Sequence, residues 1–122
     1  LIICDSGHNA DGLGKSVRQL LSMKHDRLHM VIGIVNDKDI NAILGLLPAN
    51  AEYYFTRAAI PRALDQDILR SEAALYSLEG SSYPSVIEAY RSALANADKK
   101  DIIFVGGSSF VVADFLRDYK NA

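Results

Sequence analysis

The sequence lacks the features that mark several large classes of protein. Its single cysteine, Cys4, allows neither a disulfide framework nor a cysteine-cluster zinc site. A formal net charge of −2 gives no basic field that would hold nucleic acid or anionic lipid. No apolar run approaches the ~18 residues of a membrane span, and no charged segment precedes an apolar one as in a secretion signal. We therefore expect a cytoplasmic domain that binds neither nucleic acid nor membrane.

What the chain does contain is enough apolar sequence for one globular domain. Its 122 residues are 49% hydrophobic and 23% charged, which are ordinary values for a soluble fold. A chain of this length buries roughly two-thirds of its unfolded surface, so a core can form without staples. The chain opens inside an apolar run, Leu1 to Cys4, with no initiator methionine. We expect residues 1–122 to form a single domain that belongs to a larger protein.

Apolar runs alternate with segments of helical period along the chain. Strands are predicted where nearly every residue is apolar or β-branched, at 1–4, 29–35, 52–56 and 102–105. The segment from Gly80 to Tyr83 fits a turn or a short edge strand, and Pro84 suits the first turn of the helix that follows.

Five segments carry apolar residues at helical spacing, and we expect these residues to face the core. They are Leu13, Val17, Leu20 and Leu21; Ile40, Ile43, Leu44 and Leu47; Leu64, Ile68 and Leu75; Ile87, Tyr90 and Leu94; and Val112, Phe115, Leu116 and Tyr119. Alternation of such helices with apolar strands predicts an α/β, Rossmann-like three-layer domain, in which a mostly parallel sheet carries helices on both faces.

Polar and glycine-rich segments follow the four predicted strands. They are Asp5-Ser6-Gly7-His8-Asn9, Asn36-Asp37-Lys38-Asp39, Thr56-Arg57 with Pro61-Arg62 close behind, and Gly106-Gly107-Ser108-Ser109. Because the carboxyl ends of parallel strands meet at one edge of a sheet, and ligands bind there, we expect these segments to share one crevice. Turns that open helix N-termini also favour anions. The sequence therefore predicts a crevice that handles phosphate or carboxylate groups.

Each of these residues also has an ordinary structural interpretation. The segment 37–39 fits a helix start. By spacing alone, Asp5 and Asn9 also fit caps of the first helix. His8 and Arg62 fit exposed loop residues, and Gly106-Gly107 fits a simple reversal of the chain. It is the convergence of these residues on one edge that favours a functional site.

Other nucleotide and metal motifs are incomplete in this sequence. Gly14-Lys15-Ser16 resembles the end of a P-loop, but Asn9 occupies the position of the first glycine of that motif. No G-x-G-x-x-G follows a strand. The three histidines, His8, His25 and His29, lack the spacing of a metal motif, so we predict no metal site within the chain.

The segments at the strand ends resemble, in order, the motifs of one family. Asp5-Ser6-Gly7-His8-Asn9 is similar to D-G-A-H-N-P, and Gly33 to Asp39 is similar to G-x-x-x-DKD. Pro61 to Leu64 matches P-R-A-L, and Val105 to Phe110 is similar to V-T-G-S-L-Y. These motifs belong to the C-terminal domain of the folylpolyglutamate synthase/dihydrofolate synthase family, within the Mur ligase superfamily. The four motifs together span most of the chain.

The resemblance implies an ATP-dependent ligase that forms an amide. A folate or pteroate carboxylate is phosphorylated to an acyl phosphate, and the amine of L-glutamate then displaces the phosphate. The preceding central domain would hold most of the ATP and Mg²⁺ sites, and this domain would close over it, so the isolated domain is expected to be inactive. By the same resemblance, Asp5 would contact the nucleotide. His8 would be the catalytic residue, near the acyl phosphate and the incoming glutamate.

Five further residues receive roles from the same resemblance. Ser108, with the backbone at Gly107, would bind on the glutamate side of the cleft. Arg62 is the candidate partner of a carboxylate or phosphate, since a guanidinium engages such anions bidentately. Asp37 and Lys38 would shape the cleft.

The chain departs from the family motifs at several positions, and this leaves the substrate preference open. Ser6-Gly7 replaces Gly-Ala, Ala10 replaces proline, Gly106 replaces threonine, and Ser109-Phe110 replaces Leu-Tyr. Two alternatives also remain open at this point. One is the C-terminal domain of a peptidoglycan-type Mur ligase, and the other is a non-catalytic Rossmann module that binds a nucleotide or another anion.

Overall fold

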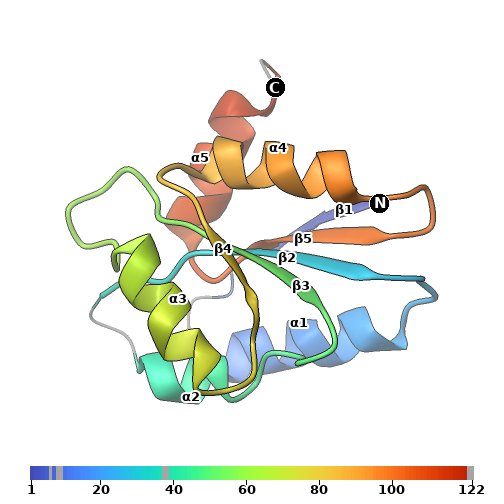
Figure 1. The fold of residues 1–122 in the computed structure, drawn as a ribbon, viewed down its shortest axis with the longest axis horizontal. Coiled ribbons are helices and arrows are strands. Elements are labelled where there is room, and N and C mark those ends of the chain that lie inside the picture. The colour runs from blue at the N-terminus through green and yellow to red at the C-terminus, as the bar shows by residue number, and fades with distance from the viewer. Residues whose placement is uncertain (6, 8–9, 37–38, 121–122) are drawn as a thin grey trace.

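The computed structural model describes residues 1–5, 7, 10–36 and 39–120. Within that part of the chain, strands and helices alternate (Figure 1). The strands are β1 (Ile2–Cys4), β2 (Leu28–Ile32), β3 (Glu52–Phe55), β4 (Gly80–Ser82) and β5 (Ile102–Gly106). The helices are α1 (Ala10–Ser22), α2 (Ile40–Leu44), α3 (Gln66–Ala74), α4 (Val86–Asn96) and α5 (Ser109–Tyr119).

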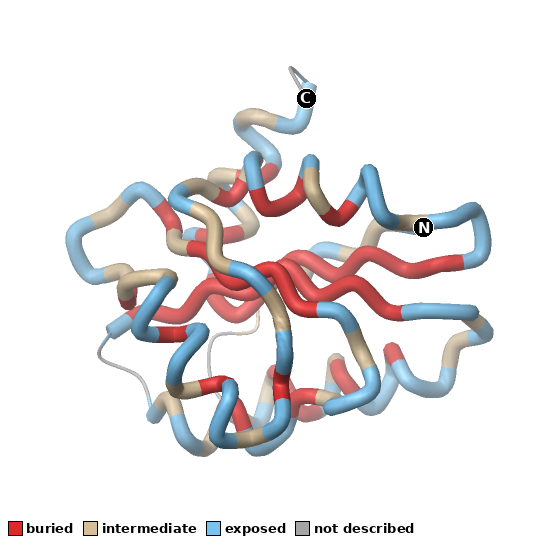
Figure 2. Tube along the Cα trace, viewed as in Figure 1, coloured by how far each residue is buried: buried red, intermediate tan, exposed pale blue. Residues whose placement is uncertain are grey.

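The strands form one sheet with the order β1-β5-β2-β3-β4, and every pair of neighbours is parallel. The central strands β2 and β5 are buried along their whole length, because helices cover both of their faces. Figure 2 shows this buried layer running through the middle of the molecule, with the exposed segments outside it. The apolar runs therefore form strands because both faces of the sheet exclude water.

Helices α1, α2 and α3 cover one face of the sheet, and α4 and α5 cover the other (Figure 1). The chain passes from β1 through β2 and β3 to β4 in one direction across the sheet, and then returns to place β5 between β1 and β2. Right-handed crossovers put helices from opposite directions of travel on opposite faces. The three-layer, Rossmann-like α/β fold predicted from the sequence is confirmed. None of the described helices is long and apolar enough to span a lipid bilayer.

Two of the predicted strand assignments needed the structure to decide them. The residues at 80–82 form the edge strand β4 rather than a turn, and β4 pairs in parallel with β3. The strand predicted over 29–35 ends at Ile32. Beyond it, the Gly33 N–H donates to the Gly106 carbonyl at 3.3 Å, and Val35 pairs with Ala63 in an isolated antiparallel bridge.

The predicted apolar face of α3 is wrong. Ile68 is 53% exposed and Leu75, which follows the helix, is 79% exposed, whereas Leu69 is fully buried. Asp65 caps the helix, because its carboxylate accepts hydrogen bonds from the N–H groups of Asp67 and Ile68. Helix α3 therefore begins after Leu64. Leu64 is buried as predicted, but within the helix Leu69 and Ala73 face the core in place of Ile68.

Smaller corrections of the same kind apply to the other helices. Leu21, Leu94 and Leu116 lie on the solvent side of α1, α4 and α5, and Ala89, Ala93 and Val111 are buried instead. Tyr119 is partly exposed, but its ring packs against Phe115 and Tyr90 as the helical spacing predicts. Ser85 is the N-cap of α4, so Pro84 precedes the helix rather than occupying its first turn. Leu47 is buried but follows the short helix α2.

Candidate functional site

The carboxyl ends of β1, β5, β2 and β3 meet at one edge of the sheet, as predicted. Hydrogen bonds continue between the loops just beyond the strands. The Asp5 N–H donates to the Val105 carbonyl at 3.1 Å, and the Thr56 N–H donates to the Ile32 carbonyl at 2.9 Å. The segments that carry the candidate residues therefore start side by side.

This edge contains the switch in strand order. Strand β5 lies between β1 and β2, yet it leads into α5 on one face, while β1 and β2 lead into α1 and α2 on the other. The chain diverges to both faces there, which leaves a crevice outside the carboxyl ends of the strands. Asp5, Gly107 and Gly33 lie at the ends of the three strands concerned.

The turn between β5 and α5 packs tightly against both neighbours. Gly107 has a φ of +98°, and a Cβ atom at this position would collide with the Gly33 carbonyl oxygen. A Cβ atom on Gly106 would lie 2.7 Å from the Phe104 ring and 3.0 Å from the Asp5 carbonyl oxygen. Two glycines are therefore required, because their backbone has to lie directly against β1 and β2.

Ser108 lies at the first turn of α5 and is only 2% exposed. It is the N-cap of that helix, and its Oγ accepts a hydrogen bond from the Val111 N–H at 3.2 Å. A hydroxyl that accepts one hydrogen bond can still donate its own proton. Ser108 thus has a structural role beside the ligand contact predicted for it.

The two carboxylate oxygens of Asp5 have different surroundings in the described part of the chain. Its Oδ1 accepts a hydrogen bond from the Gly7 N–H at 3.1 Å, so the side chain closes a turn rather than capping α1, which begins at Ala10. Its Oδ2 is buried and has no hydrogen-bond partner among the described residues. A buried acceptor without a donor costs about 1–3 kcal/mol. Such an atom fits a site where a ligand supplies the missing donor.

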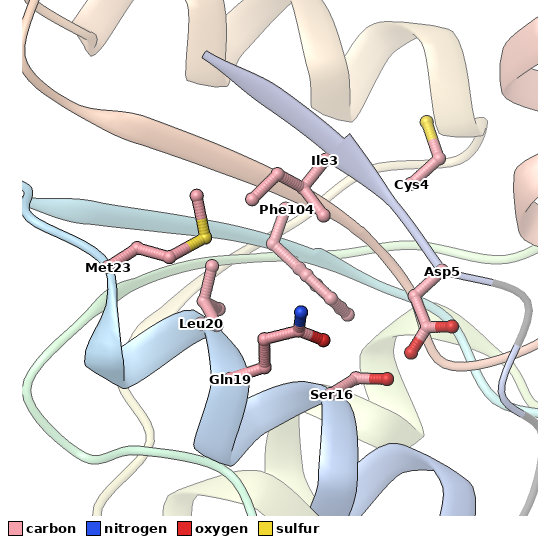
Figure 3. A pocket seen from close by; sticks show the side chains of 8 residues that line it. All are labelled: Ile3, Cys4, Asp5, Ser16, Gln19, Leu20, Met23 and Phe104. Atoms are coloured by element: carbon pink, nitrogen blue, oxygen red, sulfur yellow. The ribbon is translucent and has the colours of Figure 1, made fainter.

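A cavity of about 230 Å³ lies beside Asp5, between β1 and α1. The side chains of Asp5, Ser16 and Gln19 line its polar side, as Figure 3 shows. Its apolar walls come from Ile3, Leu20, Met23 and Phe104. Cys4 points away from these side chains, and burial raises the pKa of its thiol.

Arg62 reaches the site from the loop between β3 and α3. This loop lies along the loop that follows β2: the Asn36 N–H donates to the Arg62 carbonyl at 2.7 Å, and the Leu64 N–H donates to the Ile34 carbonyl at 2.9 Å. The Arg62 guanidinium carbon lies 5.4 Å from the centre of the Phe110 ring, on the first turn of α5. Arg62 therefore lies at the same edge as Asp5, Gly107 and Ser108.

Three predicted residues, His8, Asp37 and Lys38, lie outside the residues that the structure describes. Their predicted roles stay predictions. Asp39, which follows Lys38, caps α2 by accepting a hydrogen bond from the Ala42 N–H at 3.1 Å. Across residues 1–5, 7, 10–36 and 39–120, no three His, Cys, Asp or Glu side chains are grouped for a metal ion. Lys15 is an exposed residue within α1, outside any phosphate-binding loop.

The sequence did not reveal a buried polar cluster at the opposite, amino-terminal edge. His29 is fully buried in β2, with Nε2 2.8 Å from Asp101 Oδ2 and Nδ1 2.9 Å from the Tyr54 hydroxyl. Hydrogen bonds from the Asp98 N–H, from His29 and from Arg27 lower the pKa of Asp101 to about 2. A histidine inside an apolar strand was the only signal of this cluster. It joins β2, β3 and the start of β5, far along the strands from the crevice.

Phe110 and Asp114 are two further residues that sequence reasoning missed. Both lie on α5, four positions apart and thus on the same side of the helix. Asp114 accepts a hydrogen bond from the Ala59 N–H at 2.7 Å, and Phe110 lies under Arg62. Only the fold brings α5 against residues 59–62.

Comparisons with known proteins agree with this arrangement. The family described as "Mur ligase, glutamate ligase domain" matches residues 1–109. Over 116 residues, the chain is 34% identical to a Haloferax volcanii protein named "Probable bifunctional folylpolyglutamate synthase/dihydropteroate synthase". The match covers 93% of this chain and 14% of that protein.

Two solved structures have a similar fold. E. coli FolC in complex with DHPP and ADP has a TM-score of 0.86 at 28% identity, over 99% of this chain and 29% of that one. A bifunctional folylpolyglutamate synthase/dihydrofolate synthase with Mn, AMPPNP and L-glutamate bound has a TM-score of 0.81 at 26% identity, over 98% of this chain and 29% of that one. The chain thus spans less than a third of the length of each of these relatives.

Proposed function

The chain belongs to the Mur ligase, glutamate ligase domain family, and from this premise we propose that it is the C-terminal domain of an ATP-dependent ligase that adds L-glutamate to a folate or pteroate. The folate-type substrate is supported by the names of the Haloferax relative and of the structure with L-glutamate bound. The DHPP and ADP of the E. coli structure support a pteroate-like acid and a nucleotide as ligands. None of these three names mentions a peptidoglycan precursor. The same proposal places the domain in the cytoplasm, where ATP and L-glutamate are supplied.

The observation that carries the proposal is that Asp5, Gly107, Ser108 and Arg62 lie along the same carboxyl edge of the sheet, which contains the switch in strand order. Asp5 supplies a buried acceptor that has no donor among the described residues, which fits a hydroxyl of the nucleotide ribose. The turn at Gly107 and Ser108 occupies the middle of the edge. Arg62 supplies a guanidinium at its other end, beyond β2. The two ends thus offer an acceptor for hydroxyl groups and a cation for a carboxylate.

The proposed reaction needs three substrates, ATP, the folate or pteroate and L-glutamate, held together in a dry cleft. A carboxylate oxygen of the folate or pteroate attacks the γ-phosphorus of ATP, and ADP leaves. The amine nitrogen of L-glutamate then attacks the acyl carbon, phosphate leaves with the bonding electron pair, and the amine loses a proton. Water must be excluded, because it would hydrolyse the acyl phosphate, and closure of two domains on one cleft achieves this.

The remaining roles follow the family motifs. His8 is the proposed catalytic residue near the reacting amine, either orienting it or accepting its proton. Asp37 and Lys38 shape the same cleft. We assign Mg²⁺ and most of the ATP contacts to the remainder of the longer polypeptide, since the relatives extend far beyond this chain. In that case this chain alone shows no turnover, and it binds ATP much more weakly than the full-length enzyme does.

The test uses the full-length protein that carries this domain. With ATP, Mg²⁺, L-glutamate and dihydropteroate or a reduced folate, we expect ADP release that requires both L-glutamate and the pteroate or folate. Mass spectrometry should show a product heavier by one glutamyl residue. Asp5→Asn weakens a charged hydrogen bond and should raise the KM for ATP about tenfold or more. Asp26→Asn, in an exposed loop at the opposite edge, is the matched control.

Two results would reject the proposal. One is ADP release that does not respond to glutamate. The other is micromolar ATP binding by this chain alone in calorimetry, which would identify a stand-alone nucleotide-binding module.

A further inference from the structure

We propose that Phe110 is a positioning residue, whose ring holds the guanidinium of Arg62 in place to receive a carboxylate of the incoming amino acid. The inference rests on the proposed function, in which Arg62 binds such a carboxylate. It gives a role to Phe110, which lies at the end of the last family motif but received no role from it. It also identifies the ligand of Arg62 as the carboxylate of an amino acid rather than as a phosphate.

The first support is the contact between the two side chains. The Arg62 guanidinium carbon lies over the Phe110 ring, 5.4 Å from its centre. Phe110 remains 37% exposed, so its ring forms a surface beside the crevice rather than part of the core. A cation over an aromatic face at an exposed site gains about 0.5–1 kcal/mol.

The second support is the way the backbone on both sides of Arg62 is fixed. The Arg62 carbonyl accepts a hydrogen bond from the Asn36 N–H at 2.7 Å, which ties it to the loop after β2. Three residues earlier, the Ala59 N–H donates to Asp114 Oδ2 at 2.7 Å, which ties the same loop to α5. Helix α5 thus holds this loop through Asp114 and the Arg62 side chain through Phe110, one turn apart.

This arrangement adds to the ordering of a long side chain. An arginine loses about 2 kcal/mol of rotamer entropy when it becomes ordered, and a ring that orders it before the ligand arrives lowers that cost on binding. The N–H donors of a guanidinium lie in its own plane and form a rigid fork. A planar, bidentate acceptor such as a carboxylate matches those donors.

The position along the edge favours the amino acid over the nucleotide. Asp5, the proposed nucleotide contact, follows β1 at one end of the sheet, whereas Arg62 is tied to the loops after β2 and β3. The β5–α5 turn lies between them. A substrate at the Arg62 end therefore lies across the β5–α5 turn from a nucleotide at the Asp5 end.

The test is steady-state kinetics of Phe110→Leu in the full-length ligase. Loss of the cation–π contact should raise the KM for L-glutamate about two- to fivefold, with kcat and the KM for ATP unchanged. Phe110→Tyr keeps an aromatic face and should restore the wild-type KM. Leu116→Ala, at a 58% exposed position of the same helix, is the control and should alter neither constant.

A second measurement needs no catalysis. In this chain, the Phe110 ring current should shift the Arg62 Nε–H proton resonance upfield, and Phe110→Leu should remove that shift. An unchanged resonance overturns the proposal.

The kinetic outcomes separate this inference from the proposed function. If Arg62→Ala raises the KM for L-glutamate but Phe110→Leu does not, the positioning role is wrong and the ligase assignment stands. If Phe110→Leu lowers kcat and raises the KM for ATP as well, its effect is on folding, and the positioning role is again wrong. If the wild-type protein forms no glutamyl product, the ligase assignment fails, and the inference fails with it.

Discussion

Replacing Gly107 with alanine should destabilise the domain, because both the backbone conformation and the surroundings of this residue suit only glycine. Gly107 has a φ of +98°, which L-residues adopt at a cost of about 1–3 kcal/mol. The new Cβ atom would also collide with the Gly33 carbonyl oxygen, and this oxygen belongs to backbone that is held at the end of β2. Overpacking of this kind costs about 1–3 kcal/mol.

The net loss should be roughly 1–5 kcal/mol, because alanine also lowers the entropy of the unfolded chain by an amount worth about 0.4–1 kcal/mol. The assay is urea unfolding followed by far-UV circular dichroism, since the chain contains no tryptophan. Gly14→Ala is the matched control. Gly14 lies inside α1, and its Cβ atom would meet Arg18 and Leu46 at ordinary distances of 3.5 and 3.6 Å.

Gly14→Ala should therefore stabilise the chain by about 0.5–1 kcal/mol, because alanine is the better helix former. The two substitutions then have effects of opposite sign. A Gly107→Ala variant within about 0.5 kcal/mol of the wild type, the range of an ordinary surface substitution, would show that the β5–α5 turn does not pack against Gly33 as described.

Three further predictions concern stability. The pKa of Asp101 lies at about 2, below its ordinary value of 3.8, so the stabilising contribution of its carboxylate is complete above pH 4 and is lost as the pH falls towards 2. The difference in unfolding free energy between wild type and Asp101→Asn should therefore shrink from pH 5 to pH 2. A constant difference would contradict this. Ser108→Ala should cost about 1 kcal/mol in urea unfolding through loss of the α5 cap, and an unchanged midpoint would contradict the capping role. Leu69→Ala should cost about 2–5 kcal/mol, whereas Ile68→Ala should stay within about 0.5 kcal/mol; equal effects would contradict the burial pattern of α3.

The parts of the fold that were predictable rest on strong local signals. The run from His29 to Ile32 and the run from Ile102 to Val105 are apolar at almost every position, which only a strand covered on both faces explains. The carboxyl-edge site then follows from the parallel sheet, because the polar segments come directly after strands. For that reason Asp5, Gly107 and Ser108 could be placed together from the sequence alone.

The errors arose where packing overrides local pattern. Ile68 and Leu75 repeat at helical spacing, but the Asp65 cap and the burial of Leu69 set the orientation of α3. Exposed apolar residues are common on folded proteins, so spacing alone could not decide between the two sets.

The contact of Phe110 with Arg62 escaped prediction for a different reason. The two residues are far apart in the sequence, and they meet only because α5 packs beside the loop between β3 and α3. The cluster of His29 with Asp101 is likewise a long-range contact, at the amino-terminal edge of β2 and β5. Neither contact leaves a periodic signal in the chain.

The central claim is that one edge of the sheet binds the nucleotide at its Asp5 end and L-glutamate at its Arg62 end. The most direct measurement is the KM of each substrate in two variants of the full-length ligase, Asp5→Asn and Arg62→Ala. We predict that Asp5→Asn raises the KM for ATP and leaves the KM for L-glutamate unchanged. Arg62→Ala should raise the KM for L-glutamate and leave the KM for ATP unchanged. Unchanged KM values in both variants, or effects on the opposite substrates, would contradict the account.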